Sequence, residues 1–415
     1  MNILILGMNY APERTSVAPF TTGLSEYLVS RGHRVFVATT FPHYPEWKVQ
    51  APYEGKAFLR ESRNGVGVLR GYVYIPRKPS TLRRILYDTS LSISAFLWGL
   101  RIGDIDVILA ISPPVQVGLS AWALSAFKRA TFVFQVKDLA VDAAVALGML
   151  KKPALVRLAR SLEGFIYRRA RKILVICQGF ADNLKARGVP EAKVLVLPDW
   201  VDTEFIRPLD RHNPFRKTQQ LGPSQFVVLH AGNMGAKQGL DNAIQAAKRL
   251  DNGDGVVFLL VGDGSEKMRL VDVAAREGVA NVRFLPLQSP DALPQMLSAA
   301  DVLLISQRAS VIDTVIPSKL LTYMAAGRPI VAAVHPESEV AKYVRKAECG
   351  LIVPPEEPSQ LADAIRGVYA SPELAAGFGR KARAFAEEHF ARKHVLQRYD
   401  EFFRGLQFSS ASGPF

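Results

Sequence analysis

The sequence predicts an α/β fold of two doubly wound domains, each with a parallel sheet covered by helices on both faces. Short apolar segments of strand length alternate with longer amphipathic segments of helix length, which is the pattern of a parallel sheet buried on both faces. The series restarts after a polar, proline-containing stretch at 202–225, which indicates a second domain. The length of 415 residues is compatible with two or three domains.

The first series defines an expected first domain, residues 1–205. Amphipathic segments between its strands predict helices, for example at 19–31 and 153–170. The expected strands are at 2–7, 34–40, 66–74, 106–112, 131–136, 172–177 and 193–198.

The second series defines an expected second domain, residues 206–384. A helical stretch from about 380 to 407 has no strand after it, and we expect a C-terminal helix at about 385–408 to pack back on the first domain. Doubly wound sheets bind ligands at the carboxyl ends of their strands, so we expect the domains to face each other across a cleft. The expected strands are at 226–232, 256–262, 282–286, 301–306 and 329–334.

Composition limits the classes of protein that fit. The chain is 48% hydrophobic and 22% charged, which is ordinary for a globular protein. Cys177 and Cys349 lack CxxC or Cys/His spacing, which argues against a disulfide framework or zinc site and favours a reducing cytoplasm. The opening MNILILG has no basic region or cleavage site, so we expect a buried strand there. The sequence has no run of about 18 apolar residues to predict a spanning helix.

Positive charge is concentrated in the first half of the chain. Residues 1–200 contain 27 Lys and Arg against 14 Asp and Glu, a net charge of +13, whereas residues 201–415 contain 25 against 24. Such a basic half is expected to approach an anionic partner: a membrane surface, a lipid diphosphate or a nucleic acid.

The segment 83–101, RRILYDTSLSISAFLWGLR, permits two interpretations. It can be a buried helix that covers the first sheet. It can also be an amphipathic helix that contacts a bilayer, which is favoured by the flanking cations. These cations are Arg77, Lys78, Arg83, Arg84 and Arg101.

Two glycine-containing loops follow expected strands of the second domain. In HAGNMGAKQGL, at 230–240, a strand ends at Gly232 and the loop contains Lys237 and Gly239. Glycines let backbone N–H groups approach an anion, and the following helix adds its partial positive charge. The Gly-Asp-Gly of LVGDGSE, at 260–266, is a weaker signal because such turns are common in α/β sheets. Each loop can also be a purely structural turn.

The stretch QRASVIDTVIPSKLLTYMAAGRP, at 307–329, predicts a helix that begins just after Pro317. Ser318 and Lys319 fall in its first turn, where a phosphate would meet free N–H groups, a hydroxyl and an ammonium. The alternative is a simple capped helix.

Three loops after strands of the first domain carry polar residues. The alternative for each is an ordinary surface loop with satisfied charges, and for His43 alone a local hydrogen bond. The candidates are Glu13 and Arg14 as acceptor contacts, then His43, Tyr44 and Trp47, then Lys137, Asp138 and Asp142.

Two motifs are missing from the sequence. The first turn reads GMNYAP and not GxGxxG, which counts against a dinucleotide-binding dehydrogenase. No GxxxxGK[ST] occurs, which excludes a Walker-type NTPase.

Taken in order, NYAPE, LSEYLVSRGHRVFVATT, LPDWVDTEF, HAGNMGAKQGL, LVGDG and PSKLLTYMAAGRPIVAA resemble the family 4 retaining glycosyltransferases of GT-B fold. Within that family the chain resembles the exopolysaccharide enzymes of the colanic-acid-cluster type. The resemblance covers almost the whole chain. It implies a nucleotide-sugar donor in the second domain, an acceptor on the basic first domain, and no required metal.

The resemblance also implies roles for individual residues of the second domain. Ser318, Lys319 and Leu320 would form a second diphosphate contact, and Gly262 and Gly264 would line the base. The first diphosphate loop would contain Gly232, Asn233, Lys237 and Gly239.

The chain departs from the family pattern at several positions. Gly232-Asn233 stands where the family often has Gly-Arg, and Lys137-Asp138 stands where many members have His-Asp. Thr314 and Thr322 occupy the positions of two common glutamates. We expect Asp313 to replace the first and the Thr322 hydroxyl to contact the ribose.

The sequence therefore predicts a retaining glycosyltransferase that uses a UDP- or GDP-sugar without metal. Lys237, Lys319 and the helix start at Ser318 would stabilise the leaving diphosphate. Asp313 would lie near the donor sugar, and Asp138 would orient the acceptor or sugar. The acceptor would be a polyprenyl-diphosphate-linked glycan of exopolysaccharide or lipopolysaccharide synthesis at the cytoplasmic face of the membrane. Two rivals are a GT-B sugar-nucleotide epimerase, which needs no basic lipid-facing half, and a nucleic-acid-binding protein, for which no reader motif appears.

Overall fold

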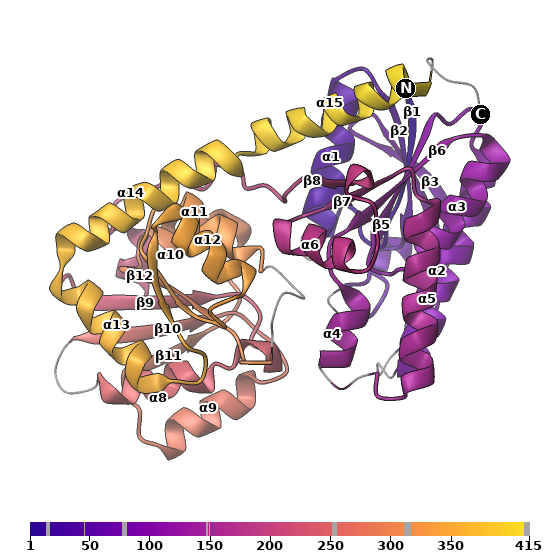
Figure 1. Ribbon diagram of the computed structural model, residues 1–415. Helices are drawn as coiled ribbons and strands as arrows, with labels where there is room; N and C mark the ends of the chain where they lie inside the picture. Colours follow the sequence, from indigo (N-terminus) through magenta and orange to yellow (C-terminus); the bar gives the residue numbers. More distant parts are fainter. Residues whose placement is uncertain are drawn as a thin grey trace. The chain divides into compact units, whose positions relative to one another are not determined.

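The computed structural model describes residues 1–13, 17–44, 46–76, 81–146, 148, 150–250, 255–310 and 317–410 (Figure 1). The chain divides into two compact units. Unit 1 comprises Met1–Asp199 and Val395–Phe415, and unit 2 comprises Trp200–His394. Each unit contains a doubly wound, largely parallel sheet with helices packed on it. The predicted fold class is therefore confirmed.

Within its described residues, unit 1 has an eight-stranded sheet in the order β3-β4-β2-β1-β5-β6-β7-β8. The apolar segments form the central strands because both faces are covered: every residue of β5 is buried. The strands are β1 Asn2–Leu6, β2 Arg34–Thr40, β3 Phe58–Arg63, β4 Val66–Gly71, β5 Val107–Ser112, β6 Thr131–Val136, β7 Lys172–Val175 and β8 Val194–Val196. The helices are α1 Ala18–Ser30, η1 Ala51–Tyr53, α2 Thr81–Arg101, α3 Val117–Lys128, α4 Ala140–Ala146, α5 Pro153–Arg169, α6 Gln178–Ala186, η2 Glu191–Lys193 and α15 Arg392–Ser410.

One edge of this sheet differs from the sequence prediction. Strand β3 was not predicted; it pairs antiparallel with β4, and β4 ends at Gly71 and not at 74. The two strands are joined by Asn64 and Gly65, whose φ angles are 47° and 81°. Asn-Gly is the sequence most typical of a two-residue hairpin turn with positive φ at both positions. That dipeptide was the available signal for β3.

Unit 2 has a six-stranded parallel sheet in the order β11-β10-β9-β12-β13-β14 in the described part of the chain. Strand β14 was not predicted, and the other five match the apolar segments within one residue. The strands are β9 Phe226–Ala231, β10 Val256–Val261, β11 Val282–Leu285, β12 Val302–Ser306, β13 Ile330–Ala333 and β14 Gly350–Val353. The helices are α7 Pro214–Thr218, η3 Ala236–Gln238, α8 Asp241–Arg249, α9 Lys267–Arg276, η4 Pro290–Ala292, α10 Leu293–Ser298, α11 Lys319–Ala325, α12 Glu339–Ala347, α13 Pro358–Ala370 and α14 Pro372–His389.

The C-terminal helical stretch is two helices, where one was predicted from about 380 to 407. Helix α14 ends at His389 and α15 begins at Arg392, and between them Ala391 forms a parallel bridge with Val201. In unit 1, Asp400 of α15 lies 2.8 Å from His33 Nε2. Gln135 donates a 2.6 Å hydrogen bond to the hydroxyl of Tyr399. The expected return of the last helix to the first domain is confirmed.

Helix α2 covers the sheet of unit 1 with one face, where Tyr87, Leu91 and Ala95 are buried. Its opposite face is exposed and apolar, as described below. Among the described residues, no helix is long and apolar enough to cross a membrane.

Candidate functional site

The sheet of unit 2 has a topological switch point at β9. From β9 the chain proceeds to β10 and β11 on one side, and it later returns to β12 on the other side. Ligands of doubly wound sheets bind at the carboxyl ends of the strands beside such a point. The loops after β9, β10 and β12 are therefore where a ligand of unit 2 is expected.

Two of these loops pack against each other through their backbones. The N–H of Met234 donates to the carbonyl of Asp263 at 2.8 Å, and the N–H of Glu266 donates to the carbonyl of Met234 at 3.0 Å. A Cβ on Gly262, whose φ is 140°, would lie 1.9 Å from the Gly232 carbonyl oxygen. A Cβ on Gly264 would lie 2.5 Å from the Met234 carbonyl oxygen. Side chains cannot occupy these positions, so the glycines bring the two loops together.

Lys319 is held at the end of β9. Its ammonium lies 3.2 Å from Nε2 of His230, which is fully buried. A Cβ built on Gly232 would lie 3.5 Å from the same ammonium. Burial lowers the pKa of Lys319 to about 7. Burial first, and then the nearby Lys319, holds the pKa of His230 well below its ordinary value, so the imidazole is neutral. Its Nε2 also lies 3.4 Å from the carbonyl oxygen of Asn233.

Helix α11 is anchored to β9 by Tyr323. The hydroxyl of this buried residue accepts a 2.8 Å hydrogen bond from the N–H of Ala231. Leu320, which is also buried, packs in the core beneath the sheet. These two contacts fix the first turn of α11 beside Gly232, and they explain why Lys319 reaches His230.

Lys237 lies in η3, in the loop between β9 and α8. Within the described chain, no carboxylate lies at ion-pair distance from its ammonium. The loop is held by Arg308, whose N–H donates to the carbonyl of Lys237 at 2.9 Å and whose Nε donates to the carbonyl of Ala236 at 2.8 Å. Gly239 ends the turn with a φ of 53°.

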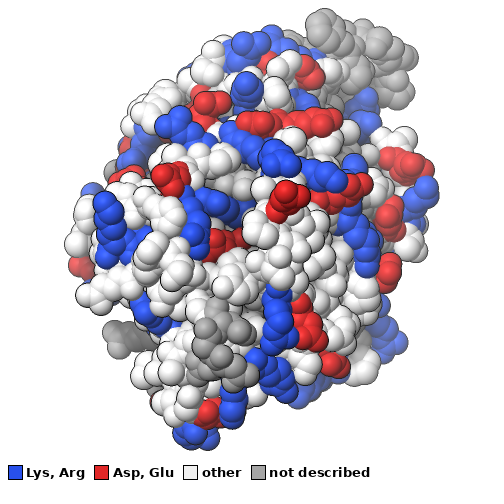
Figure 2. Space-filling model, turned by 90° about the vertical axis from the view of Figure 1, so that its left-hand side faces the viewer, with Lys and Arg blue, Asp and Glu red and all other residues white. Residues whose placement is uncertain are grey.

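Some other charges near this point are paired. Arg269 lies 2.7 Å from Asp241 and 2.6 Å from Glu266. On the face shown in Figure 2, basic and acidic side chains are interspersed. Lys237, Lys267 and the partly buried Lys319 form no ion pair among the described residues, so they are cations that an anionic ligand can meet at the switch point. The Lys267 ammonium donates to the carbonyl of Gly262 at 2.8 Å.

The remaining expected residues of unit 2 lie around this point. Ser318 is exposed and precedes α11, without a side-chain hydrogen bond to the helix end. Asn233 is exposed after β9, and the hydroxyl of Thr322 donates to the carbonyl of Ser318 at 3.4 Å. Because the Leu320 side chain is in the core, only its backbone can contact a ligand. Asp313 and Thr314 lie outside the described residues.

In unit 1, Glu13 and His43 are brought together but are not open to solvent. The carboxylate of Glu13 accepts hydrogen bonds from the N–H groups of His43 (3.0 Å) and Tyr44 (2.9 Å) and from Asn9 (3.0 Å). His43 Nε2 lies 3.0 Å from the hydroxyl of Tyr87, and burial lowers the pKa of His43. This arrangement ties the loop after β1 to the loop after β2. Arg14 and Pro45 lie outside the described residues.

Lys137 and Asp138 follow β6. The buried ammonium of Lys137 forms an ion pair with Asp199 and lies 4.8 Å from the centre of the Phe20 ring. Asp138 is partly exposed at the same edge of the sheet. Asp142 is not part of this group, because its carboxylate is bound to Arg187.

Sequence reasoning missed His230, Arg308 and Asp199. The signal for His230 was a polar residue within an otherwise apolar strand, FVVLHA. Arg308 and Asp199 offered no periodic signal, because their roles depend on contacts with residues about 60 to 70 positions away in the chain. Among the described residues, no group of three or more His, Cys, Asp or Glu side chains is placed to hold a metal ion.

Comparison with known families identifies both units. A model of the group 1 glycosyl transferases matches residues 213–385, which lie in unit 2. A model of a glycosyl transferase 4-like domain matches residues 15–200, which lie almost wholly in unit 1. Together these matches follow the division of the chain into two units.

Similar sequences carry the same assignment. The chain is 31% identical over 413 residues to the putative colanic acid biosynthesis glycosyl transferase WcaI of Escherichia coli strain K12, with 98% of this chain and 100% of that protein covered. It is 26% identical over 265 residues to the probable glycosyltransferase WbjE of Pseudomonas aeruginosa, with 63% of this chain and 65% of that protein covered.

Solved structures show the same fold at low sequence identity. Sucrose-phosphate synthase of Thermosynechococcus elongatus matches with a TM-score of 0.76 and 19% identity, over 99% of this chain and 100% of that one. WaaG, a glycosyltransferase involved in lipopolysaccharide biosynthesis, matches with a TM-score of 0.68 and 16% identity, over 97% and 99%. The chain therefore belongs to the group 1, family 4-like glycosyltransferases of GT-B fold, and it is a transferase.

Proposed function

We propose that the protein is a retaining glycosyltransferase whose unit 2 binds the diphosphate of a UDP- or GDP-sugar. The observation that carries this proposal is the placement of Lys319 beside neutral His230 and next to Gly232, at the switch point of a doubly wound sheet. A partly buried ammonium that has no carboxylate partner among the described residues is stabilised when a phosphate arrives. Lys237 adds a second cation from the adjacent loop. A solved relative in fold, Anabaena HepE, was crystallised with UDP (TM-score 0.73, 17% identity).

The chemistry proposed for this site is displacement on the front face of the sugar. The diphosphate leaves, and its own oxygen takes the proton of the acceptor hydroxyl, so that no protein nucleophile is required. The protein then contributes positioning and electrostatic stabilisation of the leaving group. Lys237, Lys319 and the backbone N–H groups at Ser318 are proposed for this stabilisation, in place of a metal ion. Asp313 retains its proposed role near the donor sugar.

Unit 1 is proposed to bind the acceptor. Asp138 and Lys137, at the carboxyl end of β6, are proposed to orient the acceptor or the sugar. Glu13 and His43 are buried and hydrogen-bonded, which supports a role in positioning the acceptor loops over direct contact with the glycan. Arg14 remains a proposed acceptor contact.

The acceptor is proposed to be a glycan on polyprenyl diphosphate, reached at the cytoplasmic face of the membrane. The supporting observation is the exposed face of α2, where five apolar side chains are 40% to 68% exposed: Leu82, Ile85, Leu86, Ile93 and Leu97. At 3.6 residues per turn they fall within about a third of the helix circumference. Basic residues occur at both ends of the helix, at Arg83, Arg84 and Arg101. An apolar stripe with flanking cations is suited to lie on an anionic bilayer.

Calorimetric titration with UDP and with GDP, without divalent metal, tests the donor site. We expect one nucleotide to bind the wild type, and Lys319→Ala to weaken that binding by about tenfold or more, since a charge-assisted contact to phosphate is lost. Lys217→Ala, an exposed lysine of α7, is the matched control and should bind as the wild type does. If neither nucleotide binds, the chain does not use a UDP- or GDP-sugar.

A further inference from the structure

Unit 1 contains a cavity of ≈590 Å³ that the proposed reaction does not use. One wall is a single face of α5, because its lining residues are spaced by three or four positions along the helix: Arg160, Glu163, Gly164, Tyr167 and Arg168. The opposite wall is the loop at 187–190, after α6, together with Lys193 at the end of η2. This volume is within the range of small-molecule sites in proteins.

The cavity lies away from the edge of the sheet where the acceptor is proposed to bind. Arg168 is followed by β7, which begins at Lys172, and Lys193 is followed by β8, which begins at Val194. Both residues therefore precede the amino ends of their strands. Lys137 and Asp138 come after the carboxyl end of β6. The amino ends and the carboxyl ends of parallel strands lie on opposite sides of the sheet, so the cavity is separate from the acceptor residues.

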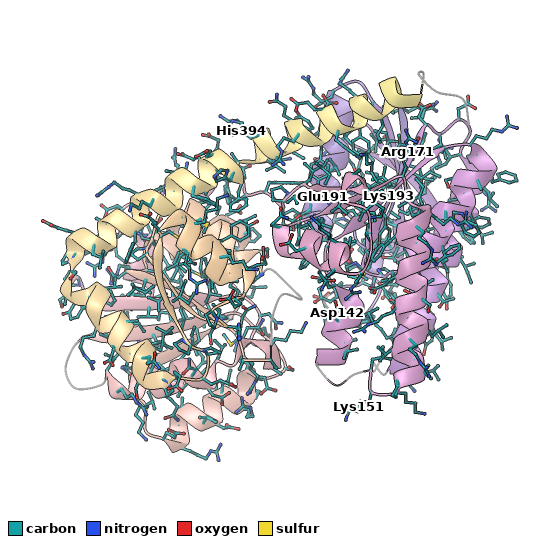
Figure 3. All side chains as sticks on the ribbon, in the orientation of Figure 1. Asp142, Lys151, Arg171, Glu191, Lys193 and His394 are labelled. Atoms are coloured by element: carbon teal, nitrogen blue, oxygen red, sulfur yellow. The ribbon has the colours of Figure 1, made fainter. Side chains whose placement is uncertain are left out.

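The charges around the cavity are unbalanced. Arg187 lies 3.1 Å from Glu163 and is also bound to Asp142, which is 3.6 Å from Arg160 (Asp142 is labelled in Figure 3). The carboxylates of Glu163 and Asp142 are thus outnumbered by four cations, which are Arg160, Arg187, Arg168 and Lys193. Burial also raises the pKa of Glu163 to about 7, which reduces its share of negative charge near neutral pH.

Two of the four cations have no carboxylate partner among the described residues. Lys193 donates to the carbonyls of Arg168 (2.8 Å) and Ala170 (3.0 Å), and neither acceptor carries a charge. The Arg168 guanidinium, on an exposed residue, forms no ion pair within the described chain. Lys193 is labelled in Figure 3. An excess of two positive charges at one cavity matches a dianion.

Tyr167 supplies a neutral donor at the same place. Its side chain is 4% exposed and lines the cavity. Burial raises the pKa of this phenol, so that it keeps its proton. A protonated hydroxyl that lines the cavity can donate a hydrogen bond to an oxygen atom of a bound anion.

We infer that this cavity binds a phosphate-bearing anion, at a site distinct from the nucleotide-sugar and acceptor sites. Arg168 and Lys193 neutralise the phosphate charge, and Tyr167 donates to one of its oxygens. Guanidinium groups bind phosphate through paired, charge-assisted hydrogen bonds, which favours phosphate over a single carboxylate.

The test is calorimetric titration of the full-length Lys319→Ala protein with inorganic pyrophosphate, because that substitution weakens the proposed site in unit 2. We expect binding to one site. Adding Arg168→Glu should weaken it by roughly tenfold or more, since a charge-assisted contact becomes a repulsion. Adding Gly164→Leu should abolish it by filling the cavity. Gly164 is inside α5, so this change should leave the melting temperature equal or higher.

The matched control is Lys151→Glu, the same charge change at a residue that precedes α5 and does not line the cavity (Figure 3). It should bind pyrophosphate as its parent does. The inference is overturned if pyrophosphate does not bind. It is also overturned if both cavity variants bind unchanged, or if Lys151→Glu weakens binding as much as Arg168→Glu.

A further experiment distinguishes two kinds of natural ligand, a lipid headgroup and a soluble phosphate compound. If the natural ligand is a lipid headgroup, vesicles containing phosphatidic acid will bind the Lys319→Ala protein, and both Gly164→Leu and free pyrophosphate will reduce that binding. If the ligand is a soluble phosphate compound, vesicle binding will be the same with and without Gly164→Leu.

Discussion

The ammonium nitrogen of Lys319 lies 3.2 Å from Nε2 of His230, at the carboxyl end of β9. The two side chains come from positions 89 residues apart. Because the imidazole is neutral, it orients the lysine without neutralising its charge. The pair is therefore arranged to be completed by an anion.

Nucleotide diphosphate binding should be coupled to proton uptake at Lys319. In the free protein its pKa is about 7, whereas the ordinary value is 10.5. A bound diphosphate favours the protonated form and raises the pKa of Lys319. Protons are therefore taken up on binding at pH values from about 7 up to that raised pKa, and affinity falls as the pH rises through this window. Titrations in two buffers of different ionisation enthalpy measure the uptake. Equal heats in both buffers, or uptake that persists in Lys319→Met, would contradict this assignment.

His230 should act as a positioning residue for Lys319. Replacing it as His230→Leu removes the acceptor that holds the ammonium, and we expect the nucleotide Kd to rise by about fivefold, the effect of losing one hydrogen bond of ~1 kcal/mol. The variant His230→Gln keeps a hydrogen-bond acceptor and should recover part of the affinity. A purely structural role predicts instead that both variants lose thermal stability while the Kd is unchanged.

Gly262 should tolerate no side chain. The substitution Gly262→Ala places a Cβ 1.9 Å from the Gly232 carbonyl oxygen, so the two loops must separate. We expect the free energy of unfolding to fall by about 2–3 kcal/mol. Urea denaturation measures this change. Gly367→Ala, inside α13 where the added Cβ meets open space, should instead raise stability by roughly 0.5–1 kcal/mol.

The apolar stripe of α2 should mediate binding to anionic vesicles. The change Ile93→Glu places a carboxylate in the centre of the stripe, and we expect vesicle affinity to fall by about tenfold or more. Flotation with vesicles of anionic and of neutral lipids measures this loss. Leu374→Glu, at an exposed leucine of α14, is the matched control and should bind as the wild type does. Equal binding by Ile93→Glu would exclude α2 as the contact surface.

Nucleotide binding should survive removal of divalent metal. Lys237 and Lys319 are proposed to supply the positive charge that a metal would otherwise bring to the diphosphate. We expect the same Kd in EDTA and in magnesium. A Kd that rises by about tenfold in EDTA would show that these two lysines are insufficient.

The strands could be predicted from sequence because a sheet buried on both faces leaves an unmistakable apolar run. The segments 34–40 and 131–136 match β2 and β6 residue for residue. Strand β3, FLRESR, lacks such a run because it lies at an edge and alternates between exposed and half-buried residues. Its neighbouring Asn-Gly turn was the better guide.

The candidate site could be predicted only in part. Lys319 follows a recognisable helix start, so its place was visible in the sequence. Glu13 and His43 were also visible as polar residues after strands, but their burial depends on tertiary hydrogen bonds that no local pattern reports. The same limit hid His230, whose partner lies 89 residues away.

The antiparallel strand β3 extends the sheet of unit 1, and its charged residues also hinder another chain from pairing with the edge of that sheet. A sheet edge presents unpaired N–H and C=O groups to which another chain can add a strand. In unit 1 this edge carries Arg60, Glu61 and Arg63 within six residues. A second molecule adding its own strand there would have to desolvate these charges. The hairpin therefore limits self-association of a chain that is almost half hydrophobic.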